Sequence, residues 1–246
     1  MKVVIHEADL CGISMPGVVK LMLPDISLDF QPVSRDQDFK KSLECLLRKP
    51  VGMTGNFNFQ GKIESQAEPR DLLKSLQGNF ELEAKNGKFE RESTLIKALT
   101  VLHIADIFFG KNLELMEKGA PYDSIKVQGN LQSGKFMLKE MVMIAPWMKM
   151  VSQGDIDMIH QEIDLTMILA PLKTVDQIIS HMPIVGYILG GDFISIPVRV
   201  RGDLKDPEII PLPPSAIGEG LLGVMKRTLT VPFKLIQPVV PRSKEK

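Results

Sequence analysis

The sequence has few aromatic residues and no excess of charge. Aromatic residues make up 6% of the 246 positions, and the 30 basic and 30 acidic residues cancel. Because neither sign collects in one half of the chain, no basic patch for nucleic acid or anionic lipid is visible. We therefore expect no nucleic acid among the partners, and a hydrophobic content of 44% predicts a globular chain with a sizeable core.

Long apolar runs are also missing. The longest weakly polar stretch, 182–191, is far shorter than the ~20 residues that a helix needs to cross a bilayer. The opening run, 1–8, is strand-like and has none of the regions of an export signal. Because the sequence starts within a strand, we expect a targeting or anchoring segment upstream, in a longer parent protein.

Motifs of catalysis and metal binding are missing as well. The sequence contains no nucleophile elbow, no phosphate-binding loop and no dinucleotide fingerprint. The four histidines lack companions at ligand spacing: His6, His103, His160 and His181. Asp155 and Asp157 fall on the polar side of a strand pattern, which favours solvation. The sequence thus predicts no metal, no cofactor and no enzymatic activity.

The chain has only two cysteines, Cys11 and Cys45. Two free thiols in a reducing compartment and one disulfide in an oxidising compartment are both consistent with this count. The residues alone leave the two possibilities open.

A short element, glycine followed by Asn or Asp and an apolar residue, recurs five times, at Gly55, Gly78, Gly129, Gly154 and Gly202. A second element, Gly-Lys-apolar, follows three of these copies, at Gly61, Gly87 and Gly134. Asn86-Gly87 and Ser133-Gly134 supply residues that adopt positive φ, as tight hairpins require. These pairs of elements predict strand, turn, strand.

Apolar and polar residues alternate around these elements, most clearly over 53–63, 125–131, 163–169 and 194–200. A period of two with one apolar side is typical of antiparallel sheets that keep one face wet. The pattern therefore disfavours a doubly wound nucleotide-binding fold. Methionine is frequent, with 14 residues, and serves either as an adaptable apolar lining or as ordinary core filling.

Helical spacing predicts helices over 35–48, 68–76, 95–109 (with Ser93 as N-cap) and from 174 to Pro183. After a proline-rich linker, 217–229 again has helical spacing. We predict an α+β fold, mainly antiparallel β: a curved one-sided sheet forming a groove, with several covering helices. The sheet region is expected over 1–212, and an amphipathic helix with a proline-rich tail over 213–246.

Several segments resemble the AsmA-like C-terminal region of the AsmA, YhdP and TamB group of Gram-negative envelope proteins. The resemblance spans nearly the whole chain through many weak positions, and its segments are 8–13, 43–47, 54–57, 78–89, 95–109, 122–125, 171–176, 183–186 and 200–207. It implies a periplasmic segment of a long β-groove, tethered to the inner membrane by an N-terminal helix that this chain lacks. It also implies a disulfide between Cys11 and Cys45.

The resemblance implies phospholipid and the membrane as partners, with passage of lipid between the inner and outer membranes. Other envelope proteins are further possible partners. The alternative function is a structural or interaction domain that assists outer-membrane protein assembly through its strand edges. The predicted lipid-binding lining is Phe57, Phe59, Ile63, Phe80, Leu82, Ile125, Val127, Leu131, Phe136, Leu138, Leu165, Ile196 and Val198.

Two features of this prediction stay open at the level of sequence. The apolar face is either a partly open groove or a dry core that helices cover. The helix 217–229 either packs on the sheet or lies on a membrane surface.

Overall fold

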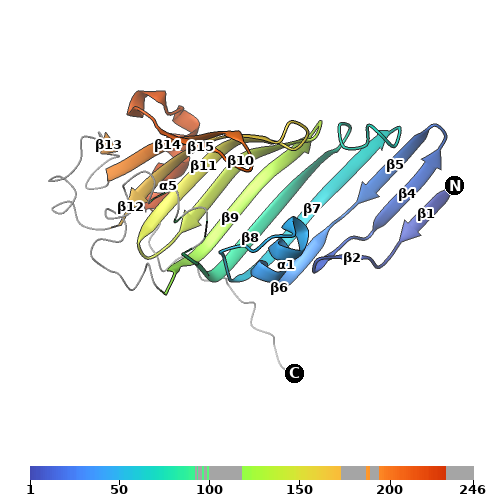
Figure 1. Ribbon diagram of the computed structural model, residues 1–246, viewed down its shortest axis with the longest axis horizontal. Coiled ribbons are helices and arrows are strands. Elements are labelled where there is room, and N and C mark those ends of the chain that lie inside the picture. The colour runs from blue at the N-terminus through green and yellow to red at the C-terminus, as the bar shows by residue number, and fades with distance from the viewer. Residues whose placement is uncertain are drawn as a thin grey trace, which may run out of the picture.

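The computed structural model describes residues 1–91, 93, 96, 99, 118–172, 187–188 and 194–230. These residues form mainly one large sheet in which every pair of strands is antiparallel and which does not close on itself (Figure 1). The strands follow one another across the sheet in the order β1-β4-β5-β7-β8-β9-β10-β11-β12-β14-β13, with β15 also paired to β14. The mainly antiparallel β prediction is confirmed.

The strands are bounded as follows: β1 Lys2–Ile5, β2 Asp9–Leu10, β3 Ile13–Ser14, β4 Gly17–Met22, β5 Asp25–Phe30, β6 Val33–Asp38, β7 Asn56–Ala67, β8 Gln77–Phe89, β9 Ala120–Gln132, β10 Lys135–Ile144, β11 Met148–Asp157, β12 Glu162–Pro171, β13 Tyr187–Ile188, β14 Ile194–Asp203 and β15 Glu208–Pro211. The helices whose bounds are described are α1 Phe39–Leu47, the short 3₁₀ helix η2 Pro214–Ala216 and α5 Glu219–Thr230. Within the described ranges, no helix has both the length and the hydropathy that a membrane crossing needs.

Strand register brings the apolar residues onto one side of the sheet, which we call the apolar face. Phe57 of β7 lies opposite Ala84 of β8, which in turn lies opposite Ile125 of β9. The same row continues through Met143, Met150, Leu169 and Ile196 on the next four strands. Because side chains alternate between faces along a strand, Asn58, Gln60 and their cross-strand neighbours point to the other side, the polar face.

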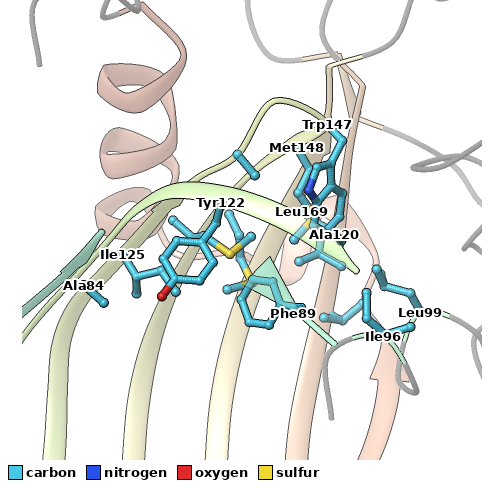
Figure 2. Close-up of a cluster of buried hydrophobic side chains, with 14 of the residues drawn as sticks. Ala84, Phe89, Ile96, Leu99, Ala120, Tyr122, Ile125, Trp147, Met148 and Leu169 are labelled. Atoms are coloured by element: carbon cyan, nitrogen blue, oxygen red, sulfur yellow. The ribbon is translucent and has the colours of Figure 1, made fainter. Parts of the chain in front are cut away.

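The main core lies at one end of the apolar face, where Figure 2 shows the side chains of Phe89, Tyr122 and Trp147. The indole Nε1 of Trp147 donates a hydrogen bond to the carbonyl oxygen of Pro121 at 2.7 Å. The Tyr122 hydroxyl donates to the carbonyl oxygen of Thr54 at 2.6 Å, and its burial raises the pKa of Tyr122 to about 12. Both buried polar tips are thus satisfied, as buried aromatic residues usually require.

The helix α5 packs on the polar face, so that α1 and α5 lie on opposite sides of the sheet (Figure 1). Its residues Leu221, Val224 and Met225 are buried against Val151 and Ile168. The buried ammonium of Lys149 donates a hydrogen bond of 2.8 Å to the carbonyl oxygen of Thr228, in the last turn of α5. The helix expected over 217–229 is therefore present, and it packs on the sheet.

One of the two predicted hairpin turns is confirmed. Ser133 and Gly134, with φ of 51° and 77°, connect β9 to β10. The prediction for Asn86-Gly87 was wrong, because both residues lie inside β8, which continues to Phe89. Asn86 has φ of 51°, an irregularity within the strand, and a Cβ on Gly87 would overlap the Thr54 carbonyl oxygen. The glycine thus permits a close approach of the chain and makes no turn. Gly61 likewise lies inside β7, and no turn follows it.

Two helix predictions were wrong in part or in whole. Residues 35–38 belong to β6, and α1 begins only at Phe39, because the Asp38 carboxylate accepts a hydrogen bond from the Lys41 amide and caps the helix there. The segment 68–76 forms consecutive turns without a helix. Of the helix expected over 95–109, only Ile96 and Leu99 are described, and both are helical. The helix expected from 174 to Pro183 and the tail lie outside the described residues.

Candidate functional site

The predicted lining residues all lie on the apolar face, and they divide into two groups by exposure. Those that are buried are Phe57, Ile125, Leu131, Leu165, Ile196 and Val198. Those that remain partly exposed are Phe59, Ile63, Phe80, Leu82, Val127, Phe136 and Leu138, and we call this second group the open patch. The structure thus brings all the predicted residues to one face, but only part of that face is accessible.

Exposure changes in the direction of the strands. The row that contains Phe57, Ile125 and Ile196 is covered, and none of these three side chains exceeds 4% exposure. In the next rows, Phe59, Phe80 and the rest of the open patch on β7 to β10 are partly exposed, whereas Leu131 on β9 and Val198 on β14 are buried. The apolar face is therefore sealed at one end and accessible further along β7 to β10.

The open patch is contiguous because its residues pair across neighbouring strands. Phe59 lies opposite Leu82, and Leu82 lies opposite Val127. Across β7 to β10 the patch spans three gaps of ~4.8 Å, or about 14 Å, and along the strands it extends over ~14 Å at ~3.4 Å per residue. These dimensions suit a flat apolar surface that contacts hydrocarbon, and no charged side chain projects from this part of the face.

The aromatic rings of the open patch lie over glycines. The ring of Phe80 occupies the space beside Gly129, where an added Cβ would come within 2.6 Å of the Phe80 Cζ atom. The same ring packs edge-to-face against Phe136, with a centroid separation of 5.3 Å. Because glycine has no side chain, a large ring can cover the backbone of the neighbouring strand, and the surface becomes flatter.

A methionine-rich area adjoins the open patch. Ser152 of β11 lies between Met141 of β10 and Met167 of β12 on the apolar face. The hydroxyl of Ser152 is fully buried and has no hydrogen-bond partner. Methionine side chains adapt their shape readily, so this area is a deformable part of the apolar face.

The polar face carries a ladder of amides and carboxylates that the sequence analysis did not single out. The Glu81 carboxylate accepts hydrogen bonds from the side-chain amides of Gln60 and Gln128, at 2.7 and 3.3 Å. Two adjoining hollows of about 460 and 560 Å³ share these three residues in their walls. Period-two alternation predicts which residues share this face, but the hollows depend on strand register.

Cys11 and Cys45 are joined by a disulfide, with their Cα atoms 5.6 Å apart. Cys11 and Gly12 form the turn between β2 and β3, and both have positive φ. Cys45 lies on α1, so the bond ties the small β2–β3 hairpin to the helix that covers the corner of the apolar face. The disulfide therefore holds α1 against this hairpin.

The sequence predicted solvated positions for Asp155 and Asp157, but this was wrong for Asp157, which is buried at 7% exposure and has a structural role. The Asp157 carboxylate accepts hydrogen bonds from the backbone amides of Ile159 and His160 in the turn between β11 and β12, and Lys135 Nζ lies 3.0 Å from it. The hydrogen bond from the His160 ring, followed by that from its backbone amide, holds the pKa of Asp157 well below its usual range. Asp155 is exposed. Among the described residues, no group of three or more His, Cys, Asp or Glu side chains is arranged to hold a metal ion.

Comparisons with known proteins assign no family to this chain. No family model, no curated protein and no solved structure matches it. The resemblance to the AsmA-like region accordingly stays a prediction from the sequence.

Proposed function

We propose that the chain is a lipid-binding segment of a bacterial cell-envelope protein of the AsmA-like type, which binds or conducts phospholipid through its apolar face. It acts by apolar burial and shape, without chemistry. In this proposal the parent protein lies in the periplasm and is anchored in the inner membrane. The open patch of β7 to β10 forms part of a groove along which acyl chains pass towards the outer membrane.

The supporting observation is the division of the apolar face into a sealed end and an accessible patch. A sheet whose apolar face served only as a core would gain by covering Phe59, Phe80 and Phe136 as completely as it covers Phe57. Each leaves apolar area in water, at about 25 cal/mol per Å². A bound hydrocarbon removes that cost and gives the exposed rings a function.

The energetics of lipid transfer give such a surface its use. An acyl chain in water costs ~0.8 kcal/mol per CH₂, or on the order of 13 kcal/mol for about 16 carbons. Contact with a continuous apolar lining offsets most of this cost. The methionines beside the patch fit the variable shapes of acyl chains, because thioether side chains repack easily.

The Cys11–Cys45 disulfide supports the proposed compartment. Disulfides persist in oxidising compartments such as the bacterial periplasm and are rare in the cytosol. A disulfide that positions α1 at the corner of the apolar face is thus compatible with a periplasmic chain.

Photo-crosslinking tests the proposal with residues that differ only in the face they occupy. A benzophenone amino acid is placed at Phe59 or, as the matched control, at Gln60, which neighbours it on β7 and points to the polar face. We expect crosslinks to phospholipid in cells and after purification from position 59. Position 60 should give few or none, because its side chain contacts water.

The same preparations are extracted and analysed for co-purified phospholipid by mass spectrometry. A protein that is folded, carries no lipid, takes none up from vesicles and crosslinks equally from both positions would refute the proposal. A Val127→Asp variant, compared with Gln128→Asp on the opposite face, should lose bound lipid while the control keeps it.

A second candidate, a structural domain that assists outer-membrane protein assembly, is favoured by the edge strand β1. Val3 and Val4 point to opposite faces of β1 and are 40% and 48% exposed. An edge with apolar residues on both faces suits the addition of another strand, since backbone hydrogen bonds supply the affinity. Crosslinks to protein from Val3 or Val4, without lipid crosslinks from position 59, would support this second function.

A further inference from the structure

A cleft of about 320 Å³ lies on the polar face, between the C-terminal half of α5 and strands β9 and β10. Its apolar walls come from Val142, Ile144 and Val224. Its remaining walls come from Ser124, Lys126, Glu140, Arg227 and Thr228. The cleft is on the side of the sheet opposite the open patch, and nothing in the proposed function uses it.

The cleft exists because the apolar strip beneath α5 is wider than the helix. Val151 and Ile168 on β11 and β12 are covered by the helix and are at most 1% exposed. Val142, directly opposite Val151 in the register, belongs to the same strip but is only partly buried. The strip thus continues past the edge of the helix and ends in the cleft, where it forms an apolar wall.

The rim of the cleft is positively charged. Lys126 and Lys85 both pair with the single carboxylate of Glu83, at 3.3 and 2.9 Å. Arg227 pairs with Glu140 at 3.4 Å, and this pair is exposed, with 69% and 40% of the two side chains accessible. Among the residues that line the cleft, the cations Lys126 and Arg227 outnumber the one carboxylate, Glu140. Exposed ion pairs of this kind are weak and exchange partners at little cost.

We propose that this cleft binds a single-chain anionic amphiphile of the fatty-acid class. The alkyl chain lies against Val142, Ile144 and Val224, and the carboxylate sits at the rim beside Lys126 and Arg227. The volume is at the lower limit of the ~300–1,000 Å³ range of ligand pockets, which suits one alkyl chain and excludes a two-chain lipid. The charge of the rim selects a carboxylate over a neutral or cationic head.

The proposal is tested on the full chain by titration calorimetry with decanoate, below its micelle concentration, and with decanol as the neutral probe. We expect decanoate to bind more tightly than decanol. The double variant Lys126→Gln, Arg227→Gln should weaken decanoate about 5- to 10-fold, because each exposed charge pair is worth a few-fold in affinity, and leave decanol unchanged. Lys62→Gln with Lys139→Gln, which removes two exposed cations of the same face outside the cleft, is the matched control.

A cleft-filling variant, Val142→Phe, should abolish binding of both probes while circular dichroism shows a folded sheet. Val127→Asp in the open patch should leave decanoate affinity unchanged, so that this site and the proposed lipid-binding face fail or succeed separately. The proposal is overturned by any of three results with folded protein: no binding of decanoate to the wild type, equal weakening by the control pair, or unchanged binding in Val142→Phe. The double charge variant alters only exposed residues and keeps the test decisive if Val142→Phe does not fold.

Discussion

Loss of the Cys11–Cys45 disulfide should destabilise the chain by about 4 kcal/mol. The bond closes a loop with a sequence separation of 34 residues. In the chain-entropy relation, a loop of about 15 residues corresponds to ~3 kcal/mol and one of about 100 to ~4.7 kcal/mol, which places a loop of this length at about 3.8 kcal/mol. That is a large fraction of the 5–15 kcal/mol that stabilises a typical domain.

The assay is urea unfolding of the wild type and of the double variant Cys11→Ser, Cys45→Ser, followed by circular dichroism. We expect a lower midpoint and a somewhat larger m-value for the variant, because its unfolded chain is more expanded. Reduced wild type is the control and should match the variant, which separates loss of the bond from the serine side chains. A difference in unfolding free energy below ~1 kcal/mol would show that the small hairpin and α1 are held without the bond, against the reasoning from loop closure.

Three further changes test other contacts of the sheet. Tyr122→Phe should cost about 1–2 kcal/mol, because it leaves the partly buried Thr54 carbonyl without its donor. The wild type should lose stability as the pH rises above ~10 towards 12, the raised pKa of the Tyr122 phenol, and the variant should not show this loss. Asp157→Asn should make stability depend less on pH in the acid range. A carboxyl whose pKa is lowered on folding stabilises the fold above pH ~4 and loses that effect as the pH falls. In thermal melts from pH 7 to 3, the melting temperature of the wild type should fall more than that of the variant, and Asp155→Asn should behave like the wild type. Gly154→Ala should lower the unfolding free energy by ~2 kcal/mol or more. The reason is that Gly154 has φ of 142° and that an added Cβ would overlap the Asp164 carbonyl oxygen. An unchanged midpoint of urea unfolding would contradict the register of β11 and β12.

The parts of the fold that sequence predicted well are those where one face is apolar and the other polar. Strands β7, β9, β12 and β14 were found by their period-two alternation, which a half-buried strand requires. Strand β1 and the strands near it lack that signal, because Val3-Val4 and Val18-Val19 place apolar residues on both faces. The pairing of these strands depends on contacts between residues far apart in the sequence, which no local sequence pattern indicates.

Local conformational preferences misled where tertiary contacts decided the structure. Asn86-Gly87 has the composition of a hairpin turn, yet the strand continues through it because Gly87 admits the backbone of Thr54 beside Tyr122. The apolar spacing from Phe39 to Leu47 fits a helix, and the prediction extended it back to residue 35, but Gln37 and Asp38 pair with β7 as part of β6. In both places the pairing of strands in the sheet overrides the local preference.

The two faces of the sheet explain why one candidate site was predictable and the other was not. The open patch consists of alternating residues on consecutive strands. Its members could therefore be predicted from the sequence without knowledge of the strand register. The cleft beside α5 combines Val142 with Val224, which are more than 80 positions apart and meet only because the helix returns to the polar face. Because α5 is narrower than the apolar strip beneath it, a gap remains that neither the sequence of α5 nor that of β10 indicates. The uncovered part of the strip forms the apolar wall of this gap, and the charged side chains beside it form the rim.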